Sequence, residues 1–348
     1  MTLQTLRSAF TPAPGYLNTA TCGLPMSGTA EAMVNAIAAW QAGSPDLVAY
    51  DEAVAAARTA FGRVVGVPAA HAAIGATTAE FVGLVAASLP AGAEVVTACG
   101  DFTSVTYPFL ARGDLRVVDV PLGRIADAIG PRTAAVALSL VQSIDGAIAD
   151  LDAIVDAARA HEALTVVDLT QAAGWLPVDA SRLDVTVTSA YKWLCAPRGT
   201  AFLTAGEEAR DRLRPVHANW YAGEDVWGSV YGHDVCLAHD TRRFDTSPAW
   251  LCWVGAVPAL EAFADELAGP DPDAIRRHDV GLADALRTRL DMAPAGTAIV
   301  SLPDPDGSKA DRLAAAGIRA AGRGECVRLG FHVWNDMEDV AAALAALI

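Results

Sequence analysis

The segment Asp184–Trp193, DVTVTSAYKW, places a lysine just after a short run of β-branched residues. The chain of 348 residues contains only one other lysine, Lys309, against 23 arginines. A lysine amine can form a Schiff base, which a guanidinium cannot, and burial makes the amine nucleophilic by lowering its pKa. Lys192 is therefore a candidate for covalent catalysis. The alternative is that Lys192 is an ordinary surface lysine. Lys309 is an example of that case, because it lies in a polar loop.

Short β-branched runs alternate with alanine-rich helical stretches on both sides of this segment. Near-continuous apolar runs joined by helical crossovers predict an α/β fold with a largely parallel sheet covered on both faces. A helix is expected at Leu151–His161, where apolar residues recur at helical spacing. Strands are expected at Glu94–Thr97, Leu115–Val120, Ala134–Val141, Leu164–Asp168, Asp184–Thr188 and Gly199–Leu203.

The composition changes after Thr204, which suggests a second, smaller domain. Residues 215–248 are rich in Trp, Tyr, Gly and His, which is typical of an ordered loop region. A helix–strand–helix pattern follows. We expect an N-terminal segment over residues 1–30 that packs with the small domain and the site, a large domain over 31–248 and a small C-terminal α/β domain over 249–348.

Charge and composition exclude several classes of partner. The net charge of −16 and the pI of about 4.7 argue against binding to nucleic acid or to an anionic membrane. The first residues, Met1–Pro14, lack the pattern of a signal peptide, and polar residues or prolines interrupt each apolar stretch. The six cysteines are scattered without a CxxC pair, which favours reduced thiols and a cytoplasmic location.

Common signatures of large α/β enzymes are absent from the sequence. There is no Walker A loop, no GxGxxG turn opening a βα unit and no GxSxG elbow. Neither HExxH nor a paired-cysteine zinc pattern occurs, so no metal is expected.

Polar side chains gather instead at the ends of two neighbouring predicted strands. Asp168 ends one strand and Gln171 follows it, while Ser189 and Lys192 end the next strand. Ligands of open parallel sheets bind at this edge. A carboxylate, an amide, a hydroxyl and an amine suit an aromatic cofactor with a ring nitrogen, a phenolic oxygen and a phosphate. An aspartate alone at this position would more often be a capping residue. Its combination with Gln171, Ser189 and Lys192 favours the binding of a cofactor.

Asp168–Leu203 resembles the core of the fold-type-I, pyridoxal 5′-phosphate (PLP) dependent enzymes of the aminotransferase class V family. This family includes cysteine desulfurases, kynureninase, isopenicillin-N-epimerase-like proteins and the C–S lyase of ergothioneine biosynthesis. The resemblance runs from Tyr16 to the C-terminus. It implies a fold-type-I PLP-dependent transferase fold, PLP as cofactor, an amino-acid substrate and a homodimer with shared active sites.

The resemblance assigns roles to individual residues. Lys192 would hold PLP as a Schiff base, Asp168 would pair with the pyridine nitrogen and Gln171 would contact the phenolic oxygen. The phosphate would lie at the turn Gly75–Thr78, where a helix start favours an anion, with Thr77 preferred over Thr78. The other implied cofactor contacts are Ala76, Phe102 stacked on the ring, Ser143 in place of a usual Asn, Ser189, Tyr191 in place of a usual His, and Ser247, which would reach the phosphate of the neighbouring subunit.

The substrate side is implied in the same way. Arg328 would grip a substrate carboxylate bidentately, with Asn18 as a further substrate contact; a surface ion pair is the alternative for Arg328. The aromatic residues Trp220, Tyr221, Trp227 and Tyr231 would shape the side-chain pocket or its lid, or else pack in a dimer interface.

The reaction type is left open by the sequence. The stretch 319–326, where desulfurases carry a loop with a nucleophilic cysteine, is short here, and Cys326 falls in a strand-like run, so a desulfurase is disfavoured. An aminotransferase-like reaction at the α-carbon is preferred. The alternatives are a C–S β-lyase or epimerase acting on a specialised, S-conjugated amino acid, and a non-catalytic binding protein of the same fold, which the retention of Asp168, Gln171 and Lys192 disfavours.

Overall fold

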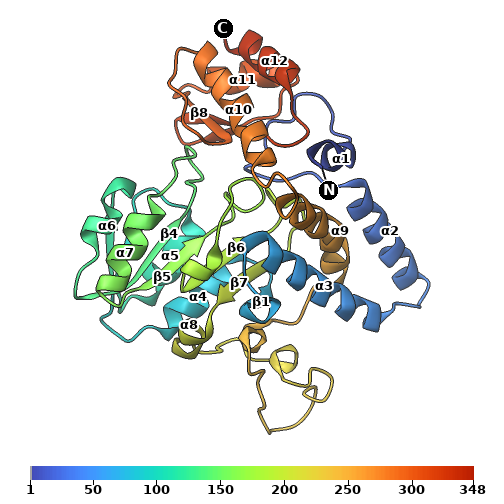
Figure 1. Ribbon diagram of the computed structural model, residues 1–348, viewed down its shortest axis with the longest axis vertical. Helices are drawn as coiled ribbons and strands as arrows, with labels where there is room; N and C mark the ends of the chain where they lie inside the picture. The colour runs from blue at the N-terminus through green and yellow to red at the C-terminus, as the bar shows by residue number, and fades with distance from the viewer. Residues whose placement is uncertain (1) are drawn as a thin grey trace.

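The computed structural model describes residues 2–348 and contains one large and one small sheet (Figure 1). The large sheet has seven strands in the order β1-β7-β6-β5-β4-β2-β3. Strands β2 to β6 run parallel, while β7 is antiparallel to both β6 and β1, so the prediction of a mostly parallel sheet is confirmed. The strands are β1 (Ala72–Gly75), β2 (Glu94–Ala98), β3 (Arg116–Val120), β4 (Thr133–Ser139), β5 (Leu164–Asp168), β6 (Val185–Ser189) and β7 (Ala201–Ala205).

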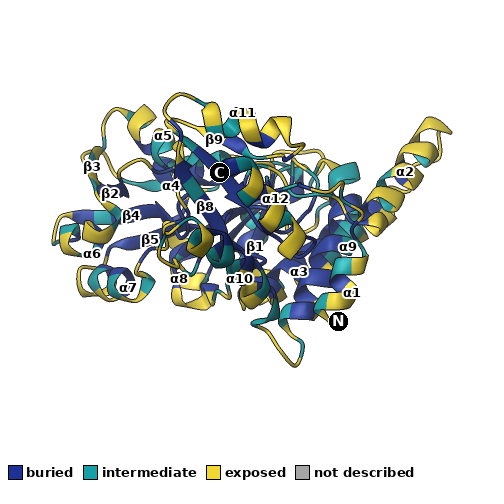
Figure 2. Ribbon diagram, turned by 90° about the horizontal axis from the view of Figure 1, so that it is seen from above, coloured by how far each residue is buried: buried dark blue, intermediate teal, exposed yellow. Residues whose placement is uncertain are grey.

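Helices cover both faces of this sheet, and the dark strands in Figure 2 lie between lighter helices. Helices α3, α6, α7 and α9 contribute to one apolar cluster, and α4, α5 and α8 contribute to another. Successive strand residues belong to opposite clusters, as Val95 and Val96 do, because side chains alternate across a strand. The helices are α1 (Leu3–Ser8), α2 (Ser27–Gln41), α3 (Leu47–Val65), α4 (Thr78–Ser88), α5 (Thr103–Arg112), α6 (Ile125–Ala128), α7 (Leu151–Ala160), α8 (Glu207–Arg212) and α9 (Trp250–Leu267).

A small antiparallel sheet with strand order β8-β10-β9 lies in the C-terminal part of the chain, at the top of Figure 1. The N-terminal segment joins it through β-bridges from Tyr16 to Arg319 and from Asn18 to Gly330. Helix α9 lies beyond residue 248 but packs against α2 and α3, and the domain boundaries at 30 and 248 stay predictions. The elements here are α10 (Ala274–Arg289), β8 (Ile299–Pro303), α11 (Ser308–Ala315), β9 (Ala321–Arg323), β10 (Cys326–Gly330) and α12 (Met337–Leu347).

The expected strands are present with ends shifted by one or two residues, and Leu164–Asp168 is matched at both ends. Strand β1 was missed, because Ala72–Gly75 carries a single β-branched residue and is held by antiparallel pairing to β7. The region 215–248 contains two short 3-10 turns, at Trp220–Ala222 and Thr241–Phe244, and a β-bridge between Gly223 and Leu237, in keeping with an ordered loop. None of the helices within residues 2–348 is long and apolar enough to cross a membrane.

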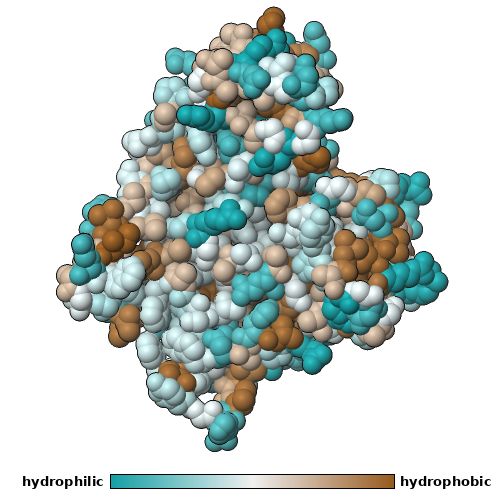
Figure 3. Space-filling model, turned by 180° about the vertical axis from the view of Figure 1, so that it is seen from behind, coloured by the Kyte–Doolittle hydropathy of each residue, from teal (hydrophilic) through white to brown (hydrophobic). Residues whose placement is uncertain are grey.

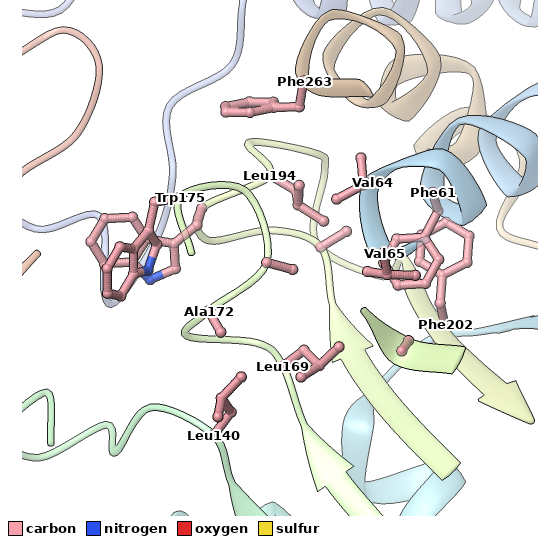
Figure 4. Close-up of a cluster of buried hydrophobic side chains, with 14 of the residues drawn as sticks. Phe61, Val64, Val65, Leu140, Leu169, Ala172, Trp175, Leu194, Phe202 and Phe263 are labelled. Atoms are coloured by element: carbon pink, nitrogen blue, oxygen red, sulfur yellow. The ribbon is translucent and has the colours of Figure 1, made fainter. Parts of the chain in front are cut away.

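Aromatic side chains pack helices α3 and α9 against strand β7, which follows the lysine segment in the chain. The rings of Phe61 and Phe202 lie face to face, with centroids 4.0 Å apart and planes 3° from parallel (Figure 4). Trp253 of α9 meets Phe202 edge-on at 5.2 Å. All three side chains are fully buried, and losing one such aromatic ring typically costs about 3–5 kcal/mol of stability. This packing gives the site a rigid support.

Candidate active site

A cavity of about 460 Å³ opens at the carboxyl ends of β5 and β6. Asp168 is the last residue of β5, and Lys192 follows β6 by three residues. Because neighbouring parallel strands end at the same edge of a sheet, the two side chains meet in one cavity. The cavity is lined by Ala76, Thr77, Thr78, Ala79, Phe102, Ser104, Ser139, Ser143, Asp168, Thr170, Gln171, Ser189, Tyr191, Lys192, Arg198 and Gly199.

Lys192 is the amine of this cavity, and its side chain is almost fully buried. The residue is 5 % exposed, and its Nζ lies 5.1 Å from the centre of the Phe102 ring. Burial lowers the pKa of the amine to about 8, with a further contribution from the positive charges of Arg328, Arg323 and Arg198. The negative charge of Asp168 opposes the shift. About a tenth of the amine is therefore unprotonated and nucleophilic at pH 7, far more than for an ordinary lysine.

Asp168 is held in a dry environment beside the amine. Burial raises the pKa of its carboxyl to about 6, although the hydrogen bond from the backbone N–H of Thr170, at 2.8 Å, and the charge of Lys192 both lower it. Within residues 2–348 its carboxylate forms no ion pair, since Lys192 acts on it only from beyond ion-pair distance. A protonated ring nitrogen placed against it would supply a cationic partner.

Three hydroxyls form a cradle at the start of α4. The Ser189 hydroxyl accepts the backbone N–H of Thr78 at 3.2 Å and lies 2.9 Å from the Thr78 hydroxyl. Thr170 joins both, since its hydroxyl lies 3.2 Å from that of Thr78 and accepts the backbone N–H of Ser189 at 2.9 Å. Hydroxyls and free backbone N–H groups at a helix start favour an anion such as phosphate.

The hydroxyls of Thr77 and Thr78 make different contacts in this turn, for which the prediction preferred Thr77 as the phosphate contact. The Thr77 hydroxyl accepts the backbone N–H of Glu80 at 3.2 Å and so caps α4. The buried Thr78 hydroxyl is the one that reaches Ser189. Both residues line the cavity, and the phosphate role of either stays a prediction.

Gln171 connects three parts of the chain through one side chain. Its Nε2 donates to the backbone oxygen of Ala20 at 2.9 Å and to the Ser143 hydroxyl at 3.2 Å. Its Oε1 accepts the indole N–H of Trp193 at 2.7 Å. The amide therefore ties the N-terminal segment to the residue that follows Lys192.

Phe102 is positioned by the carboxylate before it. Asp101 is buried and accepts four hydrogen bonds, from the backbone N–H of Phe102, from the backbone N–H and hydroxyl of Ser139, and from Nε2 of Gln142. Phe102 itself is 44 % exposed and borders the cavity. The ring is therefore open to a flat partner on its cavity side.

Arg328 reaches the same region from the small sheet. Its Nη1 donates to the backbone oxygen and hydroxyl of Ser143, and its Nη2 donates to the Thr21 hydroxyl at 2.9 Å. Within residues 2–348 its Nε has no hydrogen-bond partner, and no carboxylate lies at ion-pair distance. Asn18, predicted beside it, has a buried side-chain oxygen that is also without a partner among these residues.

The family is identified by comparison with known proteins. The family model for aminotransferase class V matches residues 49–309, three quarters of the chain. The chain belongs to the aminotransferase class V family. It is therefore a PLP-dependent enzyme of the transferase or lyase type that acts on amino acids.

Individual relatives carry different activities. The chain is 28 % identical to an uncharacterized aminotransferase, YcbU, of Bacillus subtilis, over 83 % of this chain and 81 % of that protein. It is 30 % identical to the isopenicillin N epimerase of Streptomyces clavuligerus, over 69 % and 65 % of the two chains. The cystine C–S lyase C-DES, solved with cysteine persulfide, has a TM-score of 0.85 at 20 % identity over 96 % of this chain and 97 % of that one. The last likeness shows the fold alone.

The residues of the cavity fit PLP. The hydroxyl cradle at α4 could bind its phosphate, the exposed face of Phe102 could stack on its ring, and the buried Asp168 could meet its ring nitrogen. Lys192 is the one amine among the residues that line the cavity. When bound, PLP supplies a protonated ring that draws electrons from the α-carbon of an amino acid.

Several predicted residues do not line the cavity of this chain. Arg328 and Asn18 are among them, although Arg328 donates to Ser143, which does line it. Ser247 is exposed and does not line it, so its role toward the neighbouring subunit stays a prediction. The four aromatic residues of the loop region also do not line it. Tyr221 and Trp227 instead donate hydrogen bonds to Asp51 of α3, at 3.0 and 2.9 Å. In this chain the loop is therefore anchored to α3 and is not a wall of the cavity.

Several residues of the site were not assigned from the sequence. Ser104, Ser139, Thr170 and Arg198 line the cavity, and Arg198 lies 4.8 Å above the Tyr191 ring. Ser139 ends β4, at the edge of the sheet where ligands bind, but the expected strand Ala134–Val141 ran two residues past it.

A buried histidine behind the lysine segment was also missed. His332 contacts the backbone oxygen of Trp193 through Nε2 and Asp279 of α10 through Nδ1, each at 3.0 Å. The sulfur of Cys195 lies 3.6 Å from the same Nε2. The contacts with Trp193 and Cys195 join the small domain to the lysine segment across more than 130 residues, so no local pattern indicates them.

Proposed function

We propose that this enzyme acts at the α-carbon of an amino acid in the manner of an aminotransferase, with Lys192 as the amine that carries the cofactor and moves the α-proton. The observation that carries the proposal is the buried guanidinium of Arg328, 1 % exposed and without an acidic partner within residues 2–348, next to the cavity of Lys192. A buried cation without a partner is costly, and a substrate carboxylate would remove that cost.

The other roles follow from the chemistry of each side chain. Asp168 would keep the ring nitrogen of bound PLP protonated, Gln171 and Ser143 would contact its ring oxygen, and Ser189, Thr78, Thr77 and Ala76 would hold its phosphate. Tyr191 completes the phosphate side, and Asn18 supports the substrate carboxylate. Their shared placement around one cavity, or directly beside it, supports these assignments.

The single amine in the cavity favours proton transfer on one face of the substrate. Besides Lys192, the ionisable residues that line the cavity are Asp168, Tyr191 and Arg198. Burial raises the pKa of the Tyr191 hydroxyl, which makes it a poor base near neutral pH. One base suffices for transamination and for β-elimination. Epimerisation through two opposed bases has less support.

A persulfide-forming desulfurase has little support. Residues 319–326 contain strand β9 and the turn into β10, and Cys326 is the first residue of β10. Its sulfur is held in a paired strand and cannot swing as a nucleophile on a mobile loop would.

The reaction is tested with a panel of amino acids, including S-conjugated cysteines, with and without an oxo-acid acceptor. Acceptor-dependent turnover is the expected result. Acceptor-independent release of pyruvate would replace transamination by β-elimination. A change in cofactor absorbance without turnover on any substrate would indicate a binding protein.

Replacing Arg328 by Gln should lower kcat/KM roughly hundredfold, chiefly through KM, because a buried charge pair is lost. The exposed Arg319 of the same domain offers a control, and Arg319→Gln should leave kcat/KM within about twofold. Steady-state kinetics with the best substrate of the panel measures both. An unchanged KM in Arg328→Gln would remove the carboxylate role.

We further infer a homodimer whose partner completes the site, with Ser247 reaching the neighbouring phosphate. Helix α2 supports this, because it projects from the body in Figure 2 and exposes Val34, Ile37 and Trp40. In the rear view of Figure 3, hydrophobic residues also reach the surface at the left edge, the side on which α2 lies. Exposed apolar patches of this kind mark interfaces.

Sedimentation of the PLP-loaded protein should give twice the chain mass of 36.0 kDa. Trp40→Glu should shift the protein toward the monomer and weaken PLP retention, because a charge is placed in an apolar contact. A monomer with full cofactor occupancy would contradict the shared site.

The free state of all six cysteines agrees with the inferred cytoplasmic location.

A further inference from the structure

A second arginine lies beside Arg328 on the small sheet. Residue Ala321 of β9 is paired with Arg328 of β10, and Arg323 is two residues further along β9. Side chains two apart on a strand share a face, so Arg323 and Arg328 are diagonal neighbours on one face of the sheet. We call these two residues the arginine pair.

The arginine pair converges on one neutral group from the N-terminal segment. The Thr21 hydroxyl accepts Nη2 of Arg328 at 2.9 Å and Nη2 of Arg323 at 3.0 Å. A single hydroxyl cannot neutralise two guanidinium groups. The remaining contacts of both residues are also to uncharged oxygens, those of Ser143 and Gly322.

No acidic group within residues 2–348 compensates these charges. Neither arginine has an ion pair, although the chain holds 41 acidic residues and a net charge of −16. The buried Nε of Arg328 is without any partner in that range. Two adjacent arginines without an acidic partner are unexpected in so acidic a chain. Their free positive charge is suited to binding an anion from outside the chain.

The positive charges of the arginine pair act on the amine of Lys192. Burial and the charge of Arg323 lower the pKa of Arg328 to about 10, and both arginines lower the pKa of Lys192. The two guanidinium groups differ in depth, because Arg328 is buried and Arg323 is exposed on the β9–β10 hairpin. A ligand with negative charge at two places could therefore meet the deep and the exposed guanidinium group together.

We propose that the arginine pair selects an amino acid with a second anionic group, a dicarboxylic or comparably charged substrate, with Arg323 receiving the side-chain anion. This inference rests on the proposed function, in which Arg328 receives the α-carboxylate. Arg323 is then a specificity-determining residue on the hairpin, and it leaves the chemistry at Lys192 unchanged.

Binding of unreactive acids tests the pair without turnover. Succinate and butyrate have four carbons each and differ by one carboxylate, and neither carries an amino group. Calorimetry with the PLP-loaded enzyme should show succinate binding about tenfold more tightly than butyrate, and the preference should weaken as salt is raised. Arg323→Gln should abolish the preference and Arg323→Lys should keep part of it. Arg319→Gln, which removes an exposed charge from the same domain, should keep all of it.

Kinetics give the second readout. The ratio of kcat/KM for aspartate over asparagine, and for glutamate over glutamine, should exceed one in the wild type for at least one pair. Arg323→Gln should lower that ratio about tenfold while leaving kcat/KM for the neutral amino acid unchanged. An equal loss on charged and neutral substrates would place Arg323 on the shared α-carboxylate and overturn the proposal.

The two experiments distinguish the role of the arginine pair from the proposed function. Turnover of amino acids without any preference for succinate or for charged substrates would overturn the arginine pair and leave the proposed function intact. A succinate preference that depends on Arg323, without turnover of any amino acid, would refute the proposed function and support the anion site.

Discussion

Lys192→Ala should abolish covalent attachment of PLP and lower turnover by about 10⁴, because no other cavity-lining residue within residues 2–348 carries an amine. The fold should persist, since the lysine forms no ion pair within residues 2–348 and its burial as a cation is unfavourable at neutral pH. Borohydride reduction followed by peptide mapping measures the attachment, and thermal unfolding measures the fold.

The other lysine provides a matched control for this experiment. Lys309 lies at the start of α11, where its Nζ donates to the backbone oxygen of Pro303. Lys309→Ala should retain the borohydride tag and the activity of the wild type. A tag on the peptide of Lys309, or attachment that survives Lys192→Ala, would refute the assignment.

Asp168→Asn should have two opposite effects. Turnover should fall roughly a hundredfold to a thousandfold, because a neutral amide cannot hold the ring nitrogen protonated. The cofactor-free protein should become more stable at pH 7, because the native carboxyl has a pKa of about 6 against an ordinary 3.8. Near-normal activity of the variant would exclude the pairing of Asp168 with the ring nitrogen.

The pH dependence follows from the direction of this shift. Between pH 4 and 6 the folded protein binds more protons at Asp168 than the unfolded chain does, so its contribution to the free energy of unfolding falls as the pH rises through that window. At pH 7 the full difference is present and amounts to about 3 kcal/mol. The stability gain of Asp168→Asn should therefore be about 3 kcal/mol at pH 7 and vanish near pH 4.

Urea unfolding of the cofactor-free proteins at both pH values measures this gain. The exposed Asp234 of the loop region serves as control, and Asp234→Asn should change the free energy of unfolding by less than about 0.5 kcal/mol at either pH. A gain of equal size at pH 4 and pH 7 would show that the stabilisation does not arise from titration of Asp168.

The strand ends are the part of the site that could be read from the chain. Asp168, Ser189 and Lys192 were placed together because they end neighbouring β-branched runs, and the parallel pairing of β5 with β6 brings them to one cavity. The turn at Thr77 and Thr78 could be located but its two hydroxyls could not be told apart. Which of them caps α4 and which turns inward depends on the backbone angles of the turn.

Local pattern by itself determined the α/β class, the mostly parallel sheet and the lysine edge of this protein, because side-chain periodicity and strand ends are properties of neighbouring residues. Only the tertiary structure decided the pairing of β1 with β7, the contact of His332 with Asp279 and the meeting of Arg323 and Arg328 at Thr21. Each of these joins residues separated by many positions in the chain. Such contacts form when the sheets and the N-terminal segment pack together, and no short stretch of sequence records them.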